Sequence, residues 1–131
     1  MAPLRILLAD GNDAVLAEVR EELEAEFEII GTATNGQDAV EAVRLFNPDV
    51  VVLDIAMSVL DGIEALERIR KINAHTKVLF LTIQEADEFI SRALTAGASG
   101  YVTKRRLLSD LAHGIREVAE GRTFLSPSLR R

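Results

Sequence analysis

Residues 50–54 read Val-Val-Val-Leu-Asp, an uninterrupted apolar run that ends on a carboxylate. Such a run is typical of a strand that is buried on both faces, because a half-exposed strand would alternate apolar and polar residues. A second run of the same kind, Val78-Leu79-Phe80-Leu81, ends next to Thr82. Strands buried on both faces occur mainly in parallel sheets that helices cover on either side. The two runs therefore predict an α/β fold.

The rest of the chain repeats this unit, because short apolar runs alternate with segments of helical period, as in βαβ folds. Five strands are predicted, at Arg5–Ala9, Ile29–Ala33, Val50–Leu53, Lys77–Leu81 and Gly100–Val102. Five helices are predicted from apolar stripes, whose members are Val15-Val19-Leu23, Val40-Val43-Phe46, Ile63-Leu66-Ile69-Ile72, Phe89-Ile90-Leu94 and Leu108-Leu111-Ile115-Val118. We expect a doubly wound, five-stranded parallel sheet in the order 2-1-3-4-5, with helices on both faces.

Length and charge limit the possible functions. The 131 residues allow one domain, which we expect to have its core at about 4–121 and to begin a linker or C-terminal tail at 122–131. Twenty-one acidic against 15 basic residues give a net charge of −6, which argues against direct nucleic-acid binding. No run is long enough to span a membrane, and a strand that begins near Leu4 leaves no room for a signal peptide. A cytoplasmic protein is expected.

Polar side chains follow four of the predicted strands: Asp10, Asp54, Thr82 and Lys104. The predicted strand order makes the first and third strands neighbours, which brings Asp10 near Asp54 at the edge where such sheets bind ligands. Each residue alone is ordinary, since Asp is common at strand ends, Thr caps helices and Lys is usually solvated. Together, two carboxylates, a hydroxyl and an ammonium suit phosphoryl transfer to an Asp nucleophile.

Several motifs, in order and spacing, resemble receiver domains of bacterial two-component response regulators. They are residues 5–10 (RILLAD), 51–57 (VVLDIAM) with Asp61-Gly62, Thr82, and 97–104 (GASGYVTK). The resemblance covers nearly the whole chain and implies a flavodoxin-like, CheY-like fold. The ending, residues 115–121 followed by Leu125-Ser126-Pro127, further resembles the subgroup that carries a LuxR-type helix-turn-helix effector.

This resemblance implies a signalling module rather than a metabolic enzyme. Asp54 would accept a phosphoryl group from a sensor histidine kinase, and Thr82 and Lys104 would contact the phosphoryl oxygens. Tyr101 would be an aromatic switch that turns inward when Thr82 moves; the alternative is a half-buried residue at a strand edge. The fourth helix, fifth strand and fifth helix would signal to a DNA-binding domain outside this chain. A homodimer through the fifth helix is a further hypothesis.

The resemblance also implies a Mg²⁺ pocket formed by Asp10, Asp54 and the backbone carbonyl of Ala56. Gly11 stands where the family usually has a second acid, so Mg²⁺ is expected to bind weakly and to keep extra water. Asp13 either substitutes through water or caps the first helix, and the cap is the simpler interpretation.

Two further departures lie near Asp54. Ser58 replaces a usual Pro, which is expected to leave the loop beside Asp54 less constrained. Ile83 follows Thr82 where the family has a small residue, so its branched side chain is expected to crowd access to Asp54. These departures keep a second hypothesis open, a degenerate receiver that acts by protein contact or dimerisation without phosphorylation. A small phosphatase or nucleotide-binding protein is disfavoured, because the chain has no Gly-rich phosphate loop and has Ala56 where an Asp-x-Asp hydrolase needs its general acid. The sequence leaves open whether the receiver is free-standing or part of a longer protein.

Overall fold

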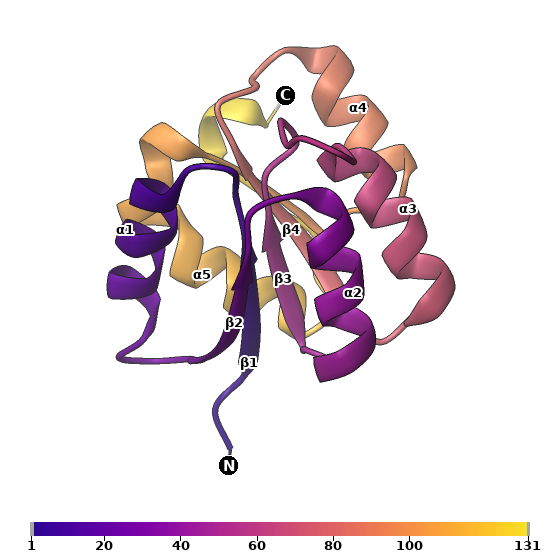
Figure 1. The fold of residues 1–131 in the computed structure, drawn as a ribbon. Coiled ribbons are helices and arrows are strands. Elements are labelled where there is room, and N and C mark those ends of the chain that lie inside the picture. The colour runs from indigo at the N-terminus through magenta and orange to yellow at the C-terminus, as the bar shows by residue number, and fades with distance from the viewer. Residues whose placement is uncertain (1, 131) are drawn as a thin grey trace.

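The computed structural model describes residues 2–130, which form one sheet between two layers of helices (Figure 1). The strands are β1 (Arg5–Ala9), β2 (Glu28–Ala33), β3 (Val50–Leu53), β4 (Lys77–Thr82), β5 (Gly100–Thr103) and β6 (Phe124–Leu125). They pair in parallel in the order β2-β1-β3-β4-β5-β6. The α/β class and the order of the first five strands are confirmed. The predicted number of five strands is wrong, because β6 adds to the outer edge of β5.

The helices divide between the two faces of the sheet. They are α1 (Asp13–Leu23), α2 (Gly36–Phe46), α3 (Gly62–Ile72), α4 (Asp87–Thr95) and α5 (Leu107–Ala119), with short 3₁₀ turns η1 (Lys104–Arg106) and η2 (Pro127–Leu129). Buried residues of α1 and α5 join one apolar core, and those of α2, α3 and α4 join the other. Figure 1 shows the two layers on opposite sides of the strands. Every helix within residues 2–130 falls short of the length and apolarity that a bilayer span requires.

Both cores draw on the same strands, because successive side chains point to opposite faces. In β1, Ile6 and Leu8 pack on the α1/α5 side, whereas Leu7 and Ala9 pack on the other side. The same alternation runs through Val50–Leu53, whose four residues are all buried. A continuous apolar strand is therefore what this two-sided burial requires.

Four members of the predicted helical stripes are exposed rather than buried in the core. Leu108 is 68% exposed and Phe46 is 44% exposed, and Ile72 and Leu94 are each 37% exposed. In α5 the buried stripe begins one residue earlier, at Leu107, and continues through Leu111, Ile115 and Val118. Leu107 lies four residues before Leu111 and so shares its face, whereas Leu108 is rotated by about 100° around the helix.

Side-chain caps begin three of the helices. The side-chain oxygen of Asn12 accepts the N–H groups of Ala14 and Val15, and the caps of α2 and α3 are Asn35 and Asp61. The predicted cap at Asp13 is wrong by one residue. Asp13 is instead the first residue of α1, where the partial positive charge of the helix N-terminus favours a carboxylate.

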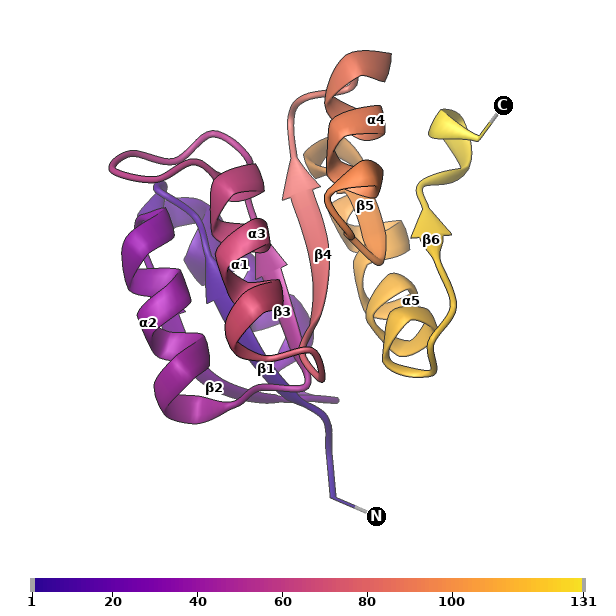
Figure 2. The same cartoon turned by 90° about the vertical axis from the view of Figure 1, so that its right-hand side faces the viewer.

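Residues that had been expected to begin a linker or tail extend the sheet. The N–H of Phe124 donates to the carbonyl of Ser99 at 3.0 Å, and the N–H of Ser126 donates to the carbonyl of Tyr101 at 3.0 Å. Phe124 and Leu129 are both buried, on opposite faces of the sheet. Figure 2 shows this segment running beside α5. It covers the outer edge of β5, which would otherwise be open.

Candidate functional site

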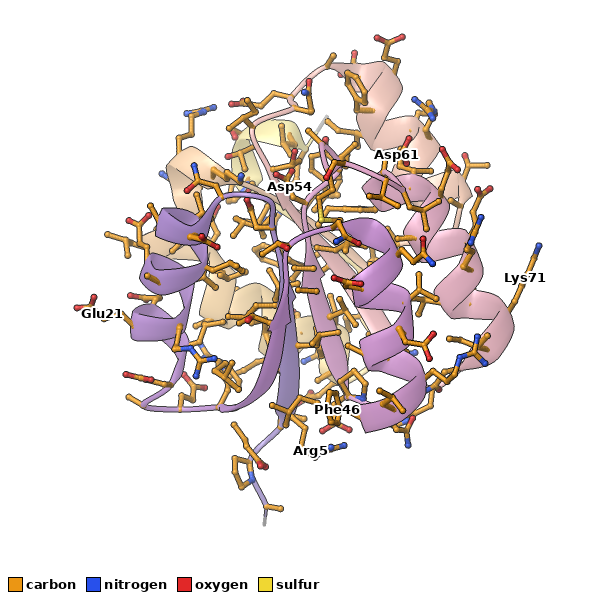
Figure 3. The ribbon with its side chains drawn as sticks, in the orientation of Figure 1. Arg5, Glu21, Phe46, Asp54, Asp61 and Lys71 are labelled. Carbon is orange, nitrogen blue, oxygen red and sulfur yellow. The ribbon has the colours of Figure 1, made fainter. Side chains whose placement is uncertain are left out.

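A single ammonium joins the two carboxylates at the carboxyl end of the sheet. Lys104 Nζ lies 2.8 Å from Asp10 Oδ2 and 3.0 Å from Asp54 Oδ2. The backbone fixes this arrangement, because the N–H of Asp54 donates to the carbonyl of Ala9 at 3.0 Å and so holds the ends of β1 and β3 together. Figure 3 places Asp54 at this end of the sheet, with Arg5 and Phe46 at the opposite end. The predicted proximity of Asp10, Asp54 and Lys104 is confirmed.

The three charged groups lie in a largely closed environment. Asp10 and Asp54 are each 5% exposed. Burial alone opposes the charged form of Lys104, but hydrogen bonds and attraction from both carboxylates outweigh it and raise the pKa of this ammonium. Lys104 therefore stays charged, and one ammonium serves two carboxyl groups. It is an electrostatically incomplete site, suited to a further cation or to a group that the Lys can neutralise.

The free oxygen of Asp54 can be identified from its contacts. Oδ2 is bound to Lys104, whereas Oδ1 receives only a long contact of 3.4 Å from the N–H of Ala56. The two oxygens of Asp10 are both engaged, since Oδ1 accepts the N–H of Asn12 at 2.9 Å and Oδ2 binds Lys104. Of the two carboxylates, Asp54 thus has the oxygen more available for nucleophilic attack.

Thr82 lies at the end of β4, and its hydroxyl oxygen is bonded to the β4–α4 loop. The oxygen accepts the N–H of Gln84 at 3.3 Å, and the carbonyl of the same Gln84 accepts the hydroxyl of Tyr101 at 2.6 Å. Tyr101 is 0% exposed, which contradicts the half-buried alternative. Burial, with smaller contributions from the charges of Asp54 and Glu85, raises the pKa of Tyr101. Both switch candidates are therefore hydrogen-bonded to the backbone of the same residue, Gln84, in the β4–α4 loop.

The loop between β3 and α3 passes close to two glycines. A Cβ at Gly62 would lie 2.1 Å from the carbonyl oxygen of Asp54, and one at Gly36 would lie 1.9 Å from that of Leu60. Only residues without a Cβ permit these approaches. Between them, Val59 adopts φ +66° and is 76% exposed. The backbone after Asp54 is thus tightly held at both ends and strained at its tip.

The oxygen ligands at this site suit a hard divalent cation, but few of them come from protein side chains. Within residues 2–130 there is no group of three or more His, Cys, Asp or Glu side chains able to hold a metal together. Asp10 and Asp54 supply carboxylate oxygens, which Mg²⁺ prefers, and water would have to supply most of the remaining ligands. Gly11 is exposed, and a Cβ there would meet only the carbonyl of Thr34 at an ordinary 3.6 Å. The missing acid is therefore not excluded by crowding.

The two departures from the family near Asp54 lie at the surface. Ile83, which was expected to crowd access to Asp54, is 69% exposed, and Ser58 is exposed as well. Ala56, predicted to offer a carbonyl to the metal, is also exposed.

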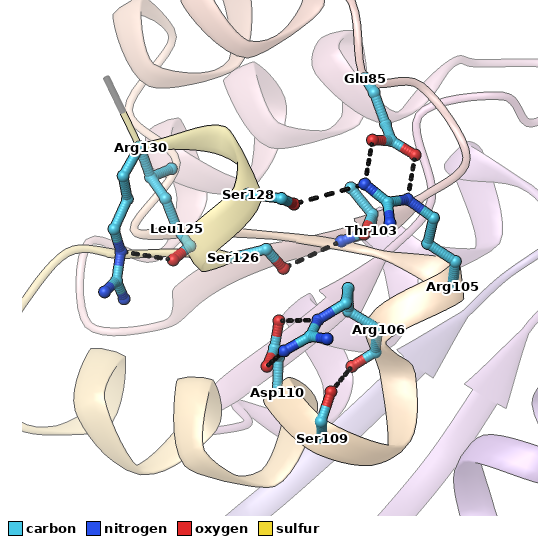
Figure 4. A network of polar contacts seen from close by, with 10 residues as sticks. All are labelled: Glu85, Thr103, Arg105, Arg106, Ser109, Asp110, Leu125, Ser126, Ser128 and Arg130. Carbon is cyan, nitrogen blue, oxygen red and sulfur yellow. Dashed lines mark hydrogen bonds and ion pairs between the residues drawn. The ribbon is translucent and has the colours of Figure 1, made fainter.

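Sequence reasoning missed the organised contacts of two basic residues in η1. Arg105 forms a paired contact with Glu85 at 2.9 and 3.0 Å, and Arg106 reaches Asp110 at 3.3 Å (Figure 4). Arg105 also comes within 3.5 Å of Ser128 Oγ. It thereby connects the β4–α4 loop with the C-terminal turn.

Comparison with known proteins gives a consistent result. A family model described as response regulator receiver domain matches residues 6–116. The chain is 33% identical over 129 residues to response regulator GacA of Pseudomonas aeruginosa, covering 96% of this chain and 60% of GacA. It is 40% identical over 100 residues to chemotaxis protein CheY of Halobacterium salinarum, covering 76% of this chain and 83% of that protein.

A solved structure agrees over almost the entire chain. The crystal structure of a LuxR-family two-component response regulator from Aurantimonas sp. SI85-9A1 matches with a TM-score of 0.93 and 31% identity, covering 98% of this chain and 93% of that chain. The curated regulators are longer, and this chain spans about three fifths of their length, 60% in the case of GacA.

Proposed function

The chain belongs to the response regulator receiver domain family, and from that premise we propose that Asp54 accepts a phosphoryl group from a sensor histidine kinase. Members of the family are signalling modules of two-component systems rather than metabolic enzymes. The observation that carries the proposal is the bridge of Lys104 between Asp10 and Asp54, at 2.8 and 3.0 Å. It gathers a nucleophile and a fixed positive charge at one buried point.

The transfer itself is a displacement at phosphorus. Asp54 Oδ1 attacks, a new O–P bond forms, and the P–N bond of the phosphohistidine donor breaks with its electron pair going to the imidazole nitrogen. Lys104 would then turn from the carboxylates to the phosphoryl oxygens, whose charge it can neutralise without a proton transfer. The hydroxyl of Thr82 would donate to another phosphoryl oxygen.

Receiver domains of this family generally bind Mg²⁺ at the phosphorylation site. In this chain Asp10, Asp54 and the carbonyl of Ala56 would hold the ion. When bound, it would offset the negative charge shared by the carboxylates and the incoming phosphoryl group. With Gly11 in place of a further acid, we expect the affinity to be low.

Signalling would follow from the hydrogen bonds that Thr82 and Tyr101 both form with the backbone of Gln84. When Thr82 Oγ1 turns toward a phosphoryl oxygen, it releases the N–H of Gln84, and Tyr101 then loses a fixed acceptor. The change would reach the face made by α4, β5 and α5, where the segment 124–130 lies against β5. Phosphorylation would thus shift a population between two arrangements of this face.

The whole protein would be a cytoplasmic transcription regulator. Its relatives include response regulators that extend beyond this domain. We propose that the receiver controls a C-terminal helix-turn-helix domain that binds DNA in its place. The receiver domain itself would comprise residues 4–130. We also propose that it can self-associate through the face made by α4, β5 and α5.

Intact mass measurement after incubation with acetyl phosphate and Mg²⁺ tests the phosphoacceptor. The wild-type protein should gain one phosphoryl group, and Asp54→Asn should gain none. Asp61→Asn is the matched control, because Asn also caps helices well and Asp61 serves as the cap of α3. This control should be labelled like the wild type.

Two results would overturn the proposal. Labelling that survives in Asp54→Asn would remove Asp54 from the role. An unlabelled wild-type protein that nevertheless switches its partner would favour the degenerate, phosphorylation-independent receiver.

A further inference from the structure

Thr103 carries a hydroxyl that the fold buries without a partner. Its side chain is 0% exposed, and among residues 2–130 its Oγ1 is the buried side-chain atom left with no hydrogen bond. Native proteins pair almost all buried hydroxyl groups, because an unpaired one loses its interaction with water and gains nothing. An exception of this kind calls for a physical reason.

The position of Thr103 supplies one. It is the last residue of β5, and the strand register places it directly beside Thr82, the last residue of β4. Residues in register on parallel strands point to the same face, with the strands about 4.8 Å apart. The two hydroxyl-bearing side chains are therefore neighbours at the end of the sheet that holds Asp54. Thr103 also lies between Tyr101 and Lys104 in the chain.

The backbone N–H of Thr103 has a hydrogen-bond partner, whereas its hydroxyl has none. Its N–H donates to Ser126 Oγ at 3.3 Å, a contact drawn in Figure 4. The segment after β6 therefore holds the main chain of Thr103 in place. Rotation about the Cα–Cβ bond remains the freedom by which the hydroxyl can find a partner.

We propose that Thr103 is a positioning residue for Thr82, one that gains its hydrogen bond only in the phosphorylated protein. This inference rests on the phosphorylation of Asp54 proposed above. As the hydroxyl of Thr82 turns to donate to a phosphoryl oxygen, its oxygen gives up the N–H of Gln84. The hydroxyl of Thr103 then donates to that vacated lone pair of Thr82 Oγ1.

The hydrogen bonds of the two threonines can be counted in both states, while the N–H of Gln84, which is only partly buried, turns to water in the phosphorylated state. A threonine hydroxyl has one donor and two acceptor positions. Before phosphorylation Thr82 accepts from Gln84 and Thr103 is unpaired; afterwards Thr82 donates to the phosphoryl group and accepts from Thr103. The penalty of the unpaired hydroxyl thus falls on the unphosphorylated state alone, which biases the equilibrium toward the switched arrangement.

Three variants test this role. Thr103→Val removes the hydroxyl at nearly constant shape, and Thr103→Ser retains it. Thr76→Val is the matched control, because Thr76 is equally buried but donates its hydroxyl to the carbonyl of Pro48 at 2.7 Å. Thr76 lies at the opposite end of the sheet from Asp54, immediately before β4.

The first measurement is the urea midpoint of the unphosphorylated proteins. Thr76→Val loses a formed hydrogen bond, so its midpoint should fall. Thr103→Val loses only an unpaired hydroxyl, so its midpoint should stay the same or rise. A fall in Thr103→Val as large as that in Thr76→Val would show that the hydroxyl is already paired, and would overturn the inference.

The second measurement is the apparent affinity for beryllofluoride with Mg²⁺, a phosphoryl mimic, followed by thermal shift. Thr103→Val should bind about tenfold more weakly than wild type, which corresponds to about 1.4 kcal/mol. Thr103→Ser should recover to within about twofold, and Thr76→Val should bind as wild type does. Equal binding by Thr103→Val and wild type would overturn the positioning role. If wild type itself neither binds the mimic nor gains a phosphoryl group, the proposed function fails, and this inference fails with it.

Discussion

The two ends of the parallel sheet use similar residues but satisfy them to different degrees. At the amino end, Thr76 donates its hydroxyl to Pro48, and Asp49 Oδ2 accepts the N–H of Arg5 at 2.8 Å. The non-glycine residue with positive φ there is Asn47, at φ +48°, which is a residue type that tolerates this conformation. Each buried polar group and each unusual backbone angle at this end has a local explanation.

The carboxyl end breaks the same rules. Asp10 and Asp54 share one ammonium, Thr103 has an unpaired hydroxyl, and the residue at positive φ is the β-branched Val59. β-branched residues adopt positive φ rarely and at a cost. Local rules that fail together at one end of a fold indicate that this end is shaped by function rather than by stability. Four changes test the comparison, in order of decreasing effect.

Removal of the shared ammonium should have the largest effect. In Lys104→Met, two carboxylates that are each 5% exposed lose their partner. Breaking a buried ion pair by removing one partner is strongly destabilising, so we expect a loss of about 3 kcal/mol in urea denaturation without metal. Added Mg²⁺ should restore part of it. At the amino end, Lys77→Met should change stability by less than about 0.5 kcal/mol, because Lys77 forms no ion pair with another residue of the range 2–130. Equal losses would remove the contrast between the two ends.

Addition of the missing acid should give the next largest effect, with opposite signs in two buffers. Gly11→Asp places a third carboxylate beside Asp10 without a steric clash. We expect at least about tenfold tighter Mg²⁺ binding, ~1.4 kcal/mol. Without metal the added charge increases repulsion, so the variant should be less stable than wild type in chelator and more stable in Mg²⁺. Parallel melting curves across a Mg²⁺ titration would show that position 11 does not face the metal.

Ionisation of Tyr101 should give a smaller effect that depends on pH. Near pH 7 the hydroxyl bond to Gln84 should make wild type more stable than Tyr101→Phe by about 1 kcal/mol. Burial raises the folded-state pKa above the ordinary 10.0, so above that pH the unfolded Tyr loses its proton while the folded one keeps it. The advantage of wild type should therefore shrink above about pH 10, by up to about 1.4 kcal/mol per pH unit, and then reverse. Urea midpoints of both proteins between pH 7 and 11 measure the difference. A constant difference would mean that the hydroxyl is not shielded from solvent.

The sequence predicted most of the architecture because burial on both faces leaves a plain pattern. β1 and β3 match their predicted bounds, and β4 and β5 each extend one residue further, to Thr82 and Thr103. Those added residues are polar, so apolar runs end before the hydrogen-bonded strands do. The two-residue β6 gave no such pattern, because its pairing depends on the edge that β5 presents.

The candidate site was predicted as a set of residues but not as a geometry. Strand order alone was sufficient to bring Asp10, Asp54 and Lys104 together. It could not reveal that Thr82 and Tyr101 hold the same Gln84, because that depends on how the β4–α4 loop turns. The unpaired hydroxyl of Thr103 was equally invisible, since threonine is an ordinary strand residue and only its surroundings make it unusual.

Relief of the strained loop should have the smallest effect. Val59 adopts φ +66° and its side chain is 76% exposed, so Val59→Gly removes the steric cost of this conformation while giving up little packing. The gain should be about 1 kcal/mol, the usual cost of one left-handed residue less the added freedom of Gly in the unfolded chain. Asn47→Gly is the counterpart at the amino end, where Asn already tolerates positive φ and its side chain contacts Asn73. The stability of that variant should not increase.

Urea denaturation of the two variants and of wild type measures the difference in stability. Phosphoryl uptake, measured on the same samples, tests whether the strain at Val59 affects function. If the strain at Val59 serves the site, the stabilised variant should take up the phosphoryl group more slowly, because its loop samples more arrangements around Asp54. A variant that is both more stable and equally fast would leave the strain at Val59 without a role, and the contrast between the two ends would then rest on Lys104 and Thr103 alone.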